Sequence, residues 1–84
     1  MNKTDYKKKI IELGLGMKSV TDMAGYCNAP YISGCFLDRD MWTVYENDER
    51  GANKIILQTN DENEAFQVLY DYMVGKKLLD EEDN

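Results

Sequence analysis

MWTVYENDERG, residues Met41–Gly51, is the stretch of this 84-residue chain that decides the fold. It contains the only tryptophan, and Trp42 and Val44 alternate with residues such as Tyr45 at the period of a strand with one buried face. The charged run that follows, Glu46–Gly51, cannot be buried and ends in glycine, which predicts an exposed hairpin turn. The stretch therefore predicts a strand, its core anchor and the turn after it.

Two further strands are expected on either side. Residues 31–37, YISGCFL, and residues 54–59, KIILQT, are rich in β-branched and aromatic side chains. The links to residues 41–46 are short, as between neighbouring antiparallel strands. Gly34, inside the first strand, suggests a bulge or the close approach of another backbone. Together the three segments predict a three-stranded antiparallel meander.

An N-terminal helix is expected over residues 5–13, with Thr4 as its cap and Gly14 as its stop. Lys7, Lys8 and Lys9 would lie on its solvated face. One apolar stripe runs along the other face and comprises Tyr6, Ile10 and Leu13. Residues 15–30 are broken up by glycines, and we expect only a short helical turn over 19–24, capped by Ser19 or Thr21.

A second helix is expected over residues 60–74. Asp61 is the predicted cap, Glu64 completes a capping box, and Gly75 is the predicted end. Its apolar face comprises Ala65, Phe66, Leu69, Tyr72 and Met73. Residues 80–84, DEEDN, have no apolar side chain and are expected to form an acidic disordered tail.

The order helix, three strands, helix predicts an α+β fold, a single domain over residues 1–79 with both helices on one face of the sheet. Tyr45, opposite Trp42 in the strand, would lie on the open face. The predicted core comprises Phe36, Trp42, Val44, Ile55 or Ile56, and Leu57 from the sheet, and Ile10, Leu13, Phe66, Leu69 and Met73 from the helices.

Composition excludes some classes of function. The net charge of −6 argues against binding to nucleic-acid phosphates, and a hydrophobic content of 43% argues against a wholly disordered chain. The chain has no histidine, so it offers no imidazole for a catalytic triad or a metal site. The spacing of Cys27 and Cys35 fits no zinc pattern, and we expect free, packed thiols. We therefore expect no enzyme, no cofactor and no metal, and, lacking a secretory leader or a long apolar run, a cytoplasmic protein.

Carboxylates gather in the second half of the chain and predict an acidic rim that attracts a basic protein partner. The expected partner-binding residues are Asp38, Asp40, Tyr45, Glu46, Asp48, Glu49, Asp61, Glu62 and Glu64. Tyr26, Tyr31 and Tyr70 are further candidate anchors, with burial in the core as the alternative for each tyrosine.

Residues 31–73 resemble small immunity proteins of bacterial polymorphic toxin systems. The resemblance rests on the run Trp42-x-Val44-Tyr45-Glu46-x-Asp48-Glu49-Arg50-Gly51 and on the Glu62-x-Glu64-Ala65-Phe66 helix start. It implies an antitoxin that binds and blocks the toxic domain of a cognate effector, without chemistry of its own. It also implies structural roles for Arg50 and Gly51, with Arg50 pairing to Asp48, Glu62 or a strand-end carbonyl, whereas the structural role expected for Trp42 follows from its place in the predicted core.

Two other functions are also compatible with the sequence. A nucleic-acid mimic that inhibits a DNA-binding enzyme would share the acidic surface, provided that its carboxylates were spaced like phosphates. A small regulatory subunit could instead dimerise through the open edge of the sheet, so a monomer and a weak homodimer are both compatible with the sequence.

Overall fold

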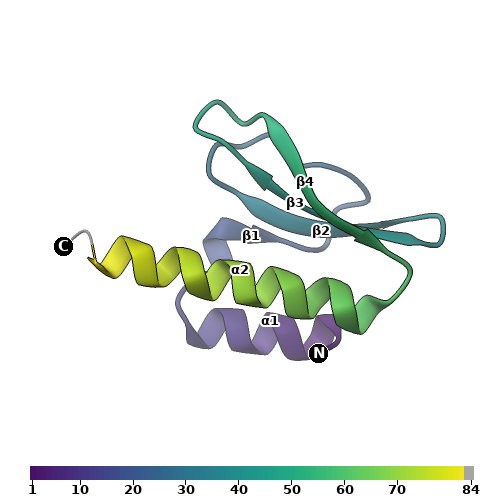
Figure 1. The fold of residues 1–84 in the computed structure, drawn as a ribbon, viewed down its shortest axis with the longest axis horizontal. Helices are drawn as coiled ribbons and strands as arrows, with labels where there is room; N and C mark the ends of the chain where they lie inside the picture. The colour runs from purple at the N-terminus through teal and green to yellow at the C-terminus, as the bar shows by residue number, and fades with distance from the viewer. Residues whose placement is uncertain (83–84) are drawn as a thin grey trace.

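The computed structural model describes residues 1–82, and the side chains of residues 1–78. Its elements follow in the order α1 (Lys3–Glu12), the 3₁₀ helix η1 (Gly16–Lys18), β1 (Ser19–Val20), β2 (Ser33–Asp38), β3 (Met41–Asn47), β4 (Asn53–Thr59) and α2 (Glu62–Glu82). The sheet forms one layer, and α1 and α2 lie side by side in the other (Figure 1). The predicted α+β class is confirmed, with both helices on one face.

The sheet has four strands in the order β1-β2-β3-β4. β2, β3 and β4 form the predicted antiparallel meander, in which Trp42 of β3 lies opposite Leu37 and Thr59. The expectation of three strands, all antiparallel, is wrong because β1 pairs in parallel with β2. β1 is only two residues long, too short to carry an alternating pattern, so its pairing is set by tertiary contacts rather than by local sequence.

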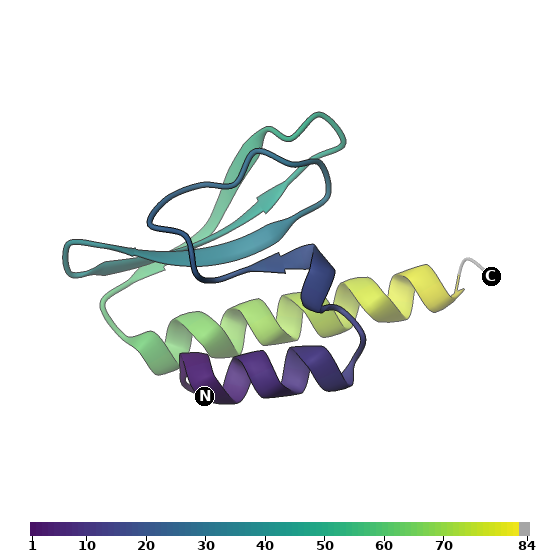
Figure 2. The same cartoon turned by 180° about the vertical axis from the view of Figure 1, so that it is seen from behind.

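Parallel neighbours need a crossover connection, and residues 21–32 provide it. This crossover passes over the face of the sheet that the helices leave uncovered (Figure 2). Tyr26 from the crossover packs edge-on against Phe36 and Tyr45 at 4.8 and 4.9 Å between ring centroids. Two expectations are therefore wrong: Phe36 does not meet the helices, and Tyr45 does not face an open side, because the crossover forms a small second core there.

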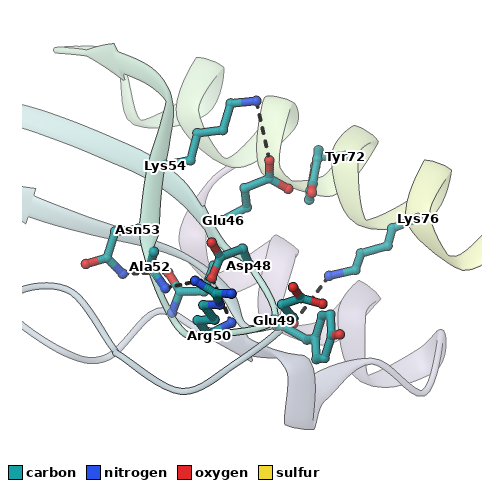
Figure 3. A pocket seen from close by; sticks show the side chains of 11 residues that line it. Glu46, Asp48, Glu49, Arg50, Ala52, Asn53, Lys54, Tyr72 and Lys76 are labelled. Atoms are coloured by element: carbon teal, nitrogen blue, oxygen red, sulfur yellow. Dashed lines mark hydrogen bonds and ion pairs between the residues drawn. The ribbon is translucent and has the colours of Figure 1, made fainter.

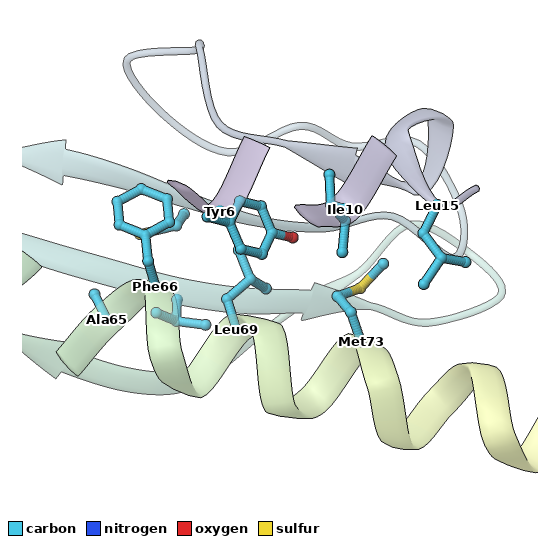
Figure 4. Packing of buried hydrophobic residues seen from close by; sticks show 9 residues of the cluster. Tyr6, Ile10, Leu15, Ala65, Phe66, Leu69 and Met73 are labelled. Atoms are coloured by element: carbon cyan, nitrogen blue, oxygen red, sulfur yellow. The ribbon is translucent and has the colours of Figure 1, made fainter. Parts of the chain in front are cut away.

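The main core lies between the sheet and the helices (Figure 4). Its buried members are Tyr6, Ile10, Leu15, Cys35, Val44, Ala65, Phe66, Leu69 and Met73. Trp42 is half-buried and meets Phe66 edge-on, at 5.3 Å between centroids. Each large side chain buried here contributes roughly 1.5–3 kcal/mol, which makes this layer the main source of stability.

The two helices run in the same direction, which brings their N-termini together (Figure 1). The backbone N–H of Lys3 donates to Glu62 Oε2 at 3.0 Å, so a carboxylate from α2 satisfies a free donor at the start of α1. The predicted cap Thr4 is wrong: Asn2 caps α1, and its Oδ1 accepts from the N–H of Asp5. Asn2 has the extended backbone that a cap requires, whereas Thr4 is already helical.

Other local expectations on the N-terminal half turn out differently. Residues 19–24 form no helical turn, and Ser19, instead of capping one, shares a 2.6 Å hydrogen bond with the hydroxyl of Tyr6. Lys7, Lys8 and Lys9 are exposed as expected, and Lys3 and Lys7 both pair with Asp22, which fastens α1 to the start of the crossover.

The second helix is longer than predicted. Gly75 does not end it, and α2 runs to Glu82, because the residues after Gly75 are good helix formers and two of them bind the rest of the fold. Lys76 Nζ donates to the carbonyl of Tyr31 and Lys77 Nζ to that of Leu13. Residues 80–82 of the expected acidic tail lie in this helix, and residues 83–84 lie outside the described part of the chain.

Candidate protein-binding site

A hollow of about 630 Å³ lies where the β3–β4 hairpin turn faces the second half of α2 (Figure 3). Three sides are built from elements distant in sequence: the end of the crossover, the hairpin and the helix. The lining residues are Tyr31, Glu46, Asn47, Asp48, Glu49, Arg50, Ala52, Asn53, Lys54, Tyr72 and Lys76. The predicted charged turn is thus one wall of this hollow.

Asp48 holds the hairpin turn in shape. Its Oδ1 accepts from the backbone N–H of Arg50 at 2.8 Å and from that of Ala52 at 2.9 Å. Its own N–H donates to the Ala52 carbonyl, and its carbonyl accepts from Gly51. An aspartate that bonds the backbone two residues on favours a turn of this kind. Asp48, expected to bind a partner, therefore supports the surface on which its neighbours are displayed.

Asn47, at the end of β3, fastens the crossover to the hairpin. Its side chain is buried, and Nδ2 donates to the carbonyls of Cys27 at 2.7 Å and Ala29 at 2.9 Å. Its Oδ1 accepts from Asn53 Nδ2, and its backbone N–H donates to the Ile32 carbonyl. The sequence does not predict this role, because an asparagine between charged residues indicates only a turn.

Tyr45 is only 1% exposed, so its side chain is not available to a partner in this fold. Its hydroxyl accepts a 2.9 Å hydrogen bond from the backbone N–H of Cys27, and burial raises its pKa above the ordinary value. A Cβ at Gly34 would lie 2.6 Å from both this hydroxyl and the Val20 carbonyl, so the close approach expected at Gly34 is confirmed. Tyr45 and Asn47 thus hold the crossover from beneath.

Tyr31 is the exposed aromatic residue of the hollow. The residue is 55% exposed, and its backbone has φ 61°, a left-handed conformation that costs energy for a bulky residue. Hydrogen bonds fix it on both sides: its N–H donates to the Asp48 carbonyl at 3.1 Å, and its carbonyl accepts from Lys76 at 3.3 Å. Backbone strain of this kind persists only where the surroundings enforce it.

Charge in the hollow is balanced rather than purely acidic. Glu46, Asp48 and Glu49 are matched by Arg50, Lys54 and Lys76 in the lining. Figure 3 shows Lys54 reaching Glu46, and Tyr72 lines the same hollow. The Lys54 Nζ to Glu46 Oε1 distance is 3.9 Å, with Lys54 78% and Glu46 25% exposed, so the ion pair is loose.

The expected acidic rim is divided between two ends of the sheet. Glu46 and Glu49 lie at the hollow, whereas Asp38 and Asp40 flank the β2–β3 turn at the other end of β3. A seven-residue strand separates these ends by roughly 20 Å. Antiparallel pairing places successive turns at opposite ends, so the acidic groups lie at the two ends of the sheet, and their action as one rim toward a partner stays a prediction.

The start of α2 joins the second acidic group, and two of its carboxylates are used within the fold. Asp61 Oδ1 accepts from the N–H groups of Asn63 at 2.9 Å and Glu64 at 3.4 Å, which confirms Asp61 as the cap. The other half of the capping box differs, because the Asp61 N–H donates to Thr59 Oγ1. Glu62 binds Lys3, and Glu64 is exposed.

Other predicted roles fall as follows. Arg50 is exposed at the turn and, among the described side chains, its guanidinium has no ion pair with Asp48 or Glu62; it is the Arg50 backbone that binds Asp48. Gly51 has φ 81°, and a Cβ there would collide with the Asn28 carbonyl. Tyr70, a candidate anchor, is half-buried beneath Lys9.

The two thiols are free and lie on opposite faces of the sheet. Cys35 belongs to the main core, where burial raises its pKa to about 12, and Cys27 belongs to the crossover. Within residues 1–78, no three Cys, Asp or Glu side chains converge as a metal site would require. The described helices include none with the length and apolar character needed to cross a bilayer.

Comparison of the chain with models of known protein families, with curated proteins and with solved structures gives no match.

Proposed function

We propose that this chain is an immunity protein, which binds the toxic domain of a cognate bacterial effector in the cytoplasm and neutralises it without chemistry of its own. The observation that carries the proposal is the hollow, where a rigid turn displays Glu46, Glu49 and Arg50 beside the exposed ring of Tyr31. The resemblance of residues 31–73 to immunity proteins points the same way.

The rigidity of the turn supports a binding role. Asp48 and Asn47 fix the hairpin and crossover by side-chain hydrogen bonds before any partner arrives. Preorganisation of this kind lowers the entropy lost on binding, and exposed tyrosine offers a large contact area at little entropic cost. The partner surface that suits Glu46 and Glu49 is basic, and opposite charge would raise the association rate.

The test is rescue from toxicity. A bacterium would express the variable C-terminal domain of a large secreted protein encoded beside this chain, with or without the chain itself. Survival that depends on the chain, together with co-purification of the two, would support the proposal; death in both cultures, with no complex, would reject it for that pair.

The surface is tested in the same assay by reversing charge at each end of the sheet. The double variant Glu46→Lys/Glu49→Lys should lose rescue and weaken binding at least tenfold. The matched control, Asp40→Lys/Glu64→Lys, makes the same charge change at the opposite end and should retain rescue. Equal effects of the two variants would place the interface elsewhere.

One observation favours a dimeric regulatory subunit as a second candidate. β4 is the outer strand of the sheet, so within residues 1–82 one edge has no paired strand along seven residues. A β-bulge opposite Val44–Tyr45 and the exposed Lys54 interrupt that edge, and both are devices that discourage strand pairing. Light scattering on the purified chain separates monomer from dimer.

The nucleic-acid mimic has less support, because the carboxylates are divided between the two ends of the sheet.

A further inference from the structure

Of the three carboxylates that line the hollow, only that of Glu46 is partly buried, and its charge is poorly compensated. Its only ion pair among the described side chains is the 3.9 Å contact with the largely exposed Lys54. Partial burial weakens the hydration of a carboxylate, so a closer cation would be favourable there. The other nearby ammonium, that of Lys76, is directed to the carbonyl of Tyr31.

The aromatic residues that line the same hollow limit which cation fits. Tyr72 lines the hollow together with Glu46, and so does Tyr31, which is more than half exposed (Figure 3). Tyrosine faces attract cations, and a planar guanidinium stacks on them better than an ammonium does. A guanidinium also donates two parallel hydrogen bonds to one carboxylate, which an ammonium cannot do.

From these observations we infer that the hollow receives an arginine side chain from a loop of the protein partner, with its guanidinium bound to Glu46 between the rings of Tyr31 and Tyr72 and with Lys54 displaced to solvent. A volume of about 630 Å³ leaves room for the side chain and part of its loop. The inference rests on the proposed function for the identity of the partner, but the hollow can be tested without that partner.

The probe is a blocked tripeptide, acetyl-Gly-Arg-Gly-amide, titrated into the isotope-labelled full chain and followed by NMR. Its lysine and citrulline counterparts serve as comparisons: citrulline keeps the shape of arginine and loses the charge. We expect millimolar binding, shifts confined to residues of the hollow, affinity about three- to fivefold weaker for lysine, and no saturable binding for citrulline. Equal binding of citrulline and arginine, or shifts centred on the opposite end of the sheet, would overturn the inference.

Three variants identify the binding groups. Glu46→Gln keeps the shape of the side chain and should abolish saturable arginine binding, whereas Glu64→Gln makes the same change at the opposite end and should have no effect. Tyr31→Asn removes the ring and substitutes a residue that tolerates the left-handed backbone, so the chain should stay folded while its affinity for arginine falls about two- to fivefold. Unchanged affinity in both Glu46→Gln and Tyr31→Asn would refute the arginine site.

Failures of the two proposals can be told apart. A chain that rescues the cell but shows no preference for the arginine peptide would retain the immunity function and lose the arginine site. A chain that binds arginine at Glu46 but neither rescues nor captures the toxic domain would retain the site and lose the immunity function for that partner.

Discussion

The carbonyl oxygen of Asn28 occupies the space beside Gly51 in which any other residue would place its Cβ. The crossover and the hairpin turn therefore touch backbone to backbone. This contact, together with the hydrogen bonds of Asn47, joins the two walls of the hollow into one unit. The glycine of the charged turn thus meets two needs at once, a positive φ and a close approach.

Replacement of Gly51 by alanine should destabilise the fold by more than about 2 kcal/mol, because the new Cβ meets a backbone carbonyl at φ 81°. Gly75→Ala is the matched control: its site inside α2 has open space around it, and the change should stabilise by about 0.5–1 kcal/mol. Urea unfolding measures both. A neutral Gly51→Ala variant would contradict the contact.

Loss of the Tyr45 hydroxyl should loosen the crossover. In Tyr45→Phe the partly buried N–H of Cys27 loses its partner, which costs about 1–3 kcal/mol. Amide hydrogen exchange should accelerate at Cys27 while the helices remain protected. Tyr26→Phe, which changes the ring that packs on Tyr45 by the same single oxygen, should leave exchange at Cys27 unaltered.

Truncation of Asn47 should have a larger effect on the same region. Asn47→Ala removes both hydrogen bonds to the crossover carbonyls and the one accepted from Asn53, and should lower the free energy of unfolding by about 2–4 kcal/mol. Asn60→Ala, at an exposed position, is the control and should change it by less than about 0.5 kcal/mol. Thermal unfolding followed by circular dichroism measures the difference.

Stability should fall in alkali because two buried groups resist ionisation. Burial raises the pKa of Tyr6 from 10.0 to about 12 and the pKa of Cys35 from 9.0 to about 12. In the unfolded chain both groups lose their protons earlier, so the stability present below pH 9 is lost progressively between about pH 9 and 12. Urea titrations from pH 7 to 11 should show this fall, with a shallower slope in Cys35→Ala. A free energy of unfolding that stays flat to pH 11 would show that the two groups are not held neutral.

Strands and helices whose apolar residues recur at a regular spacing were predictable from sequence. Elements that form only through tertiary contacts were not. The alternation of apolar and polar residues around Trp42 predicts β3. The apolar face and the Asp61 cap predict α2. β1 has only two residues, and it forms a strand only because the fold places it beside β2. Gly75 locally favours the end of a helix, but contacts made by the residues after it keep α2 helical.

The candidate site was predictable in part for the same reason. A charged turn is readable from composition, which marks Glu46 and Glu49. Asp38 and Asp61 lie at the other end of the sheet, because antiparallel pairing places successive turns at opposite ends, and their part in one binding surface with Glu46 and Glu49 stays a prediction. Tyr45 is amphipathic, and only the path of the crossover decides that it is covered. Asn47 gives no signal in sequence because its partners are carbonyls about twenty residues earlier.

The parallel packing of the helices has a practical use in assays. With α1 beginning beside Glu62, the amino terminus lies at the opposite end of the molecule from the hairpin (Figure 1). A chain tethered to a sensor chip or a resin through that terminus would orient its hollow outward, whereas attachment at the far end of α2 would crowd it. Immobilisation geometry should therefore decide whether binding of a partner at the hollow is detected.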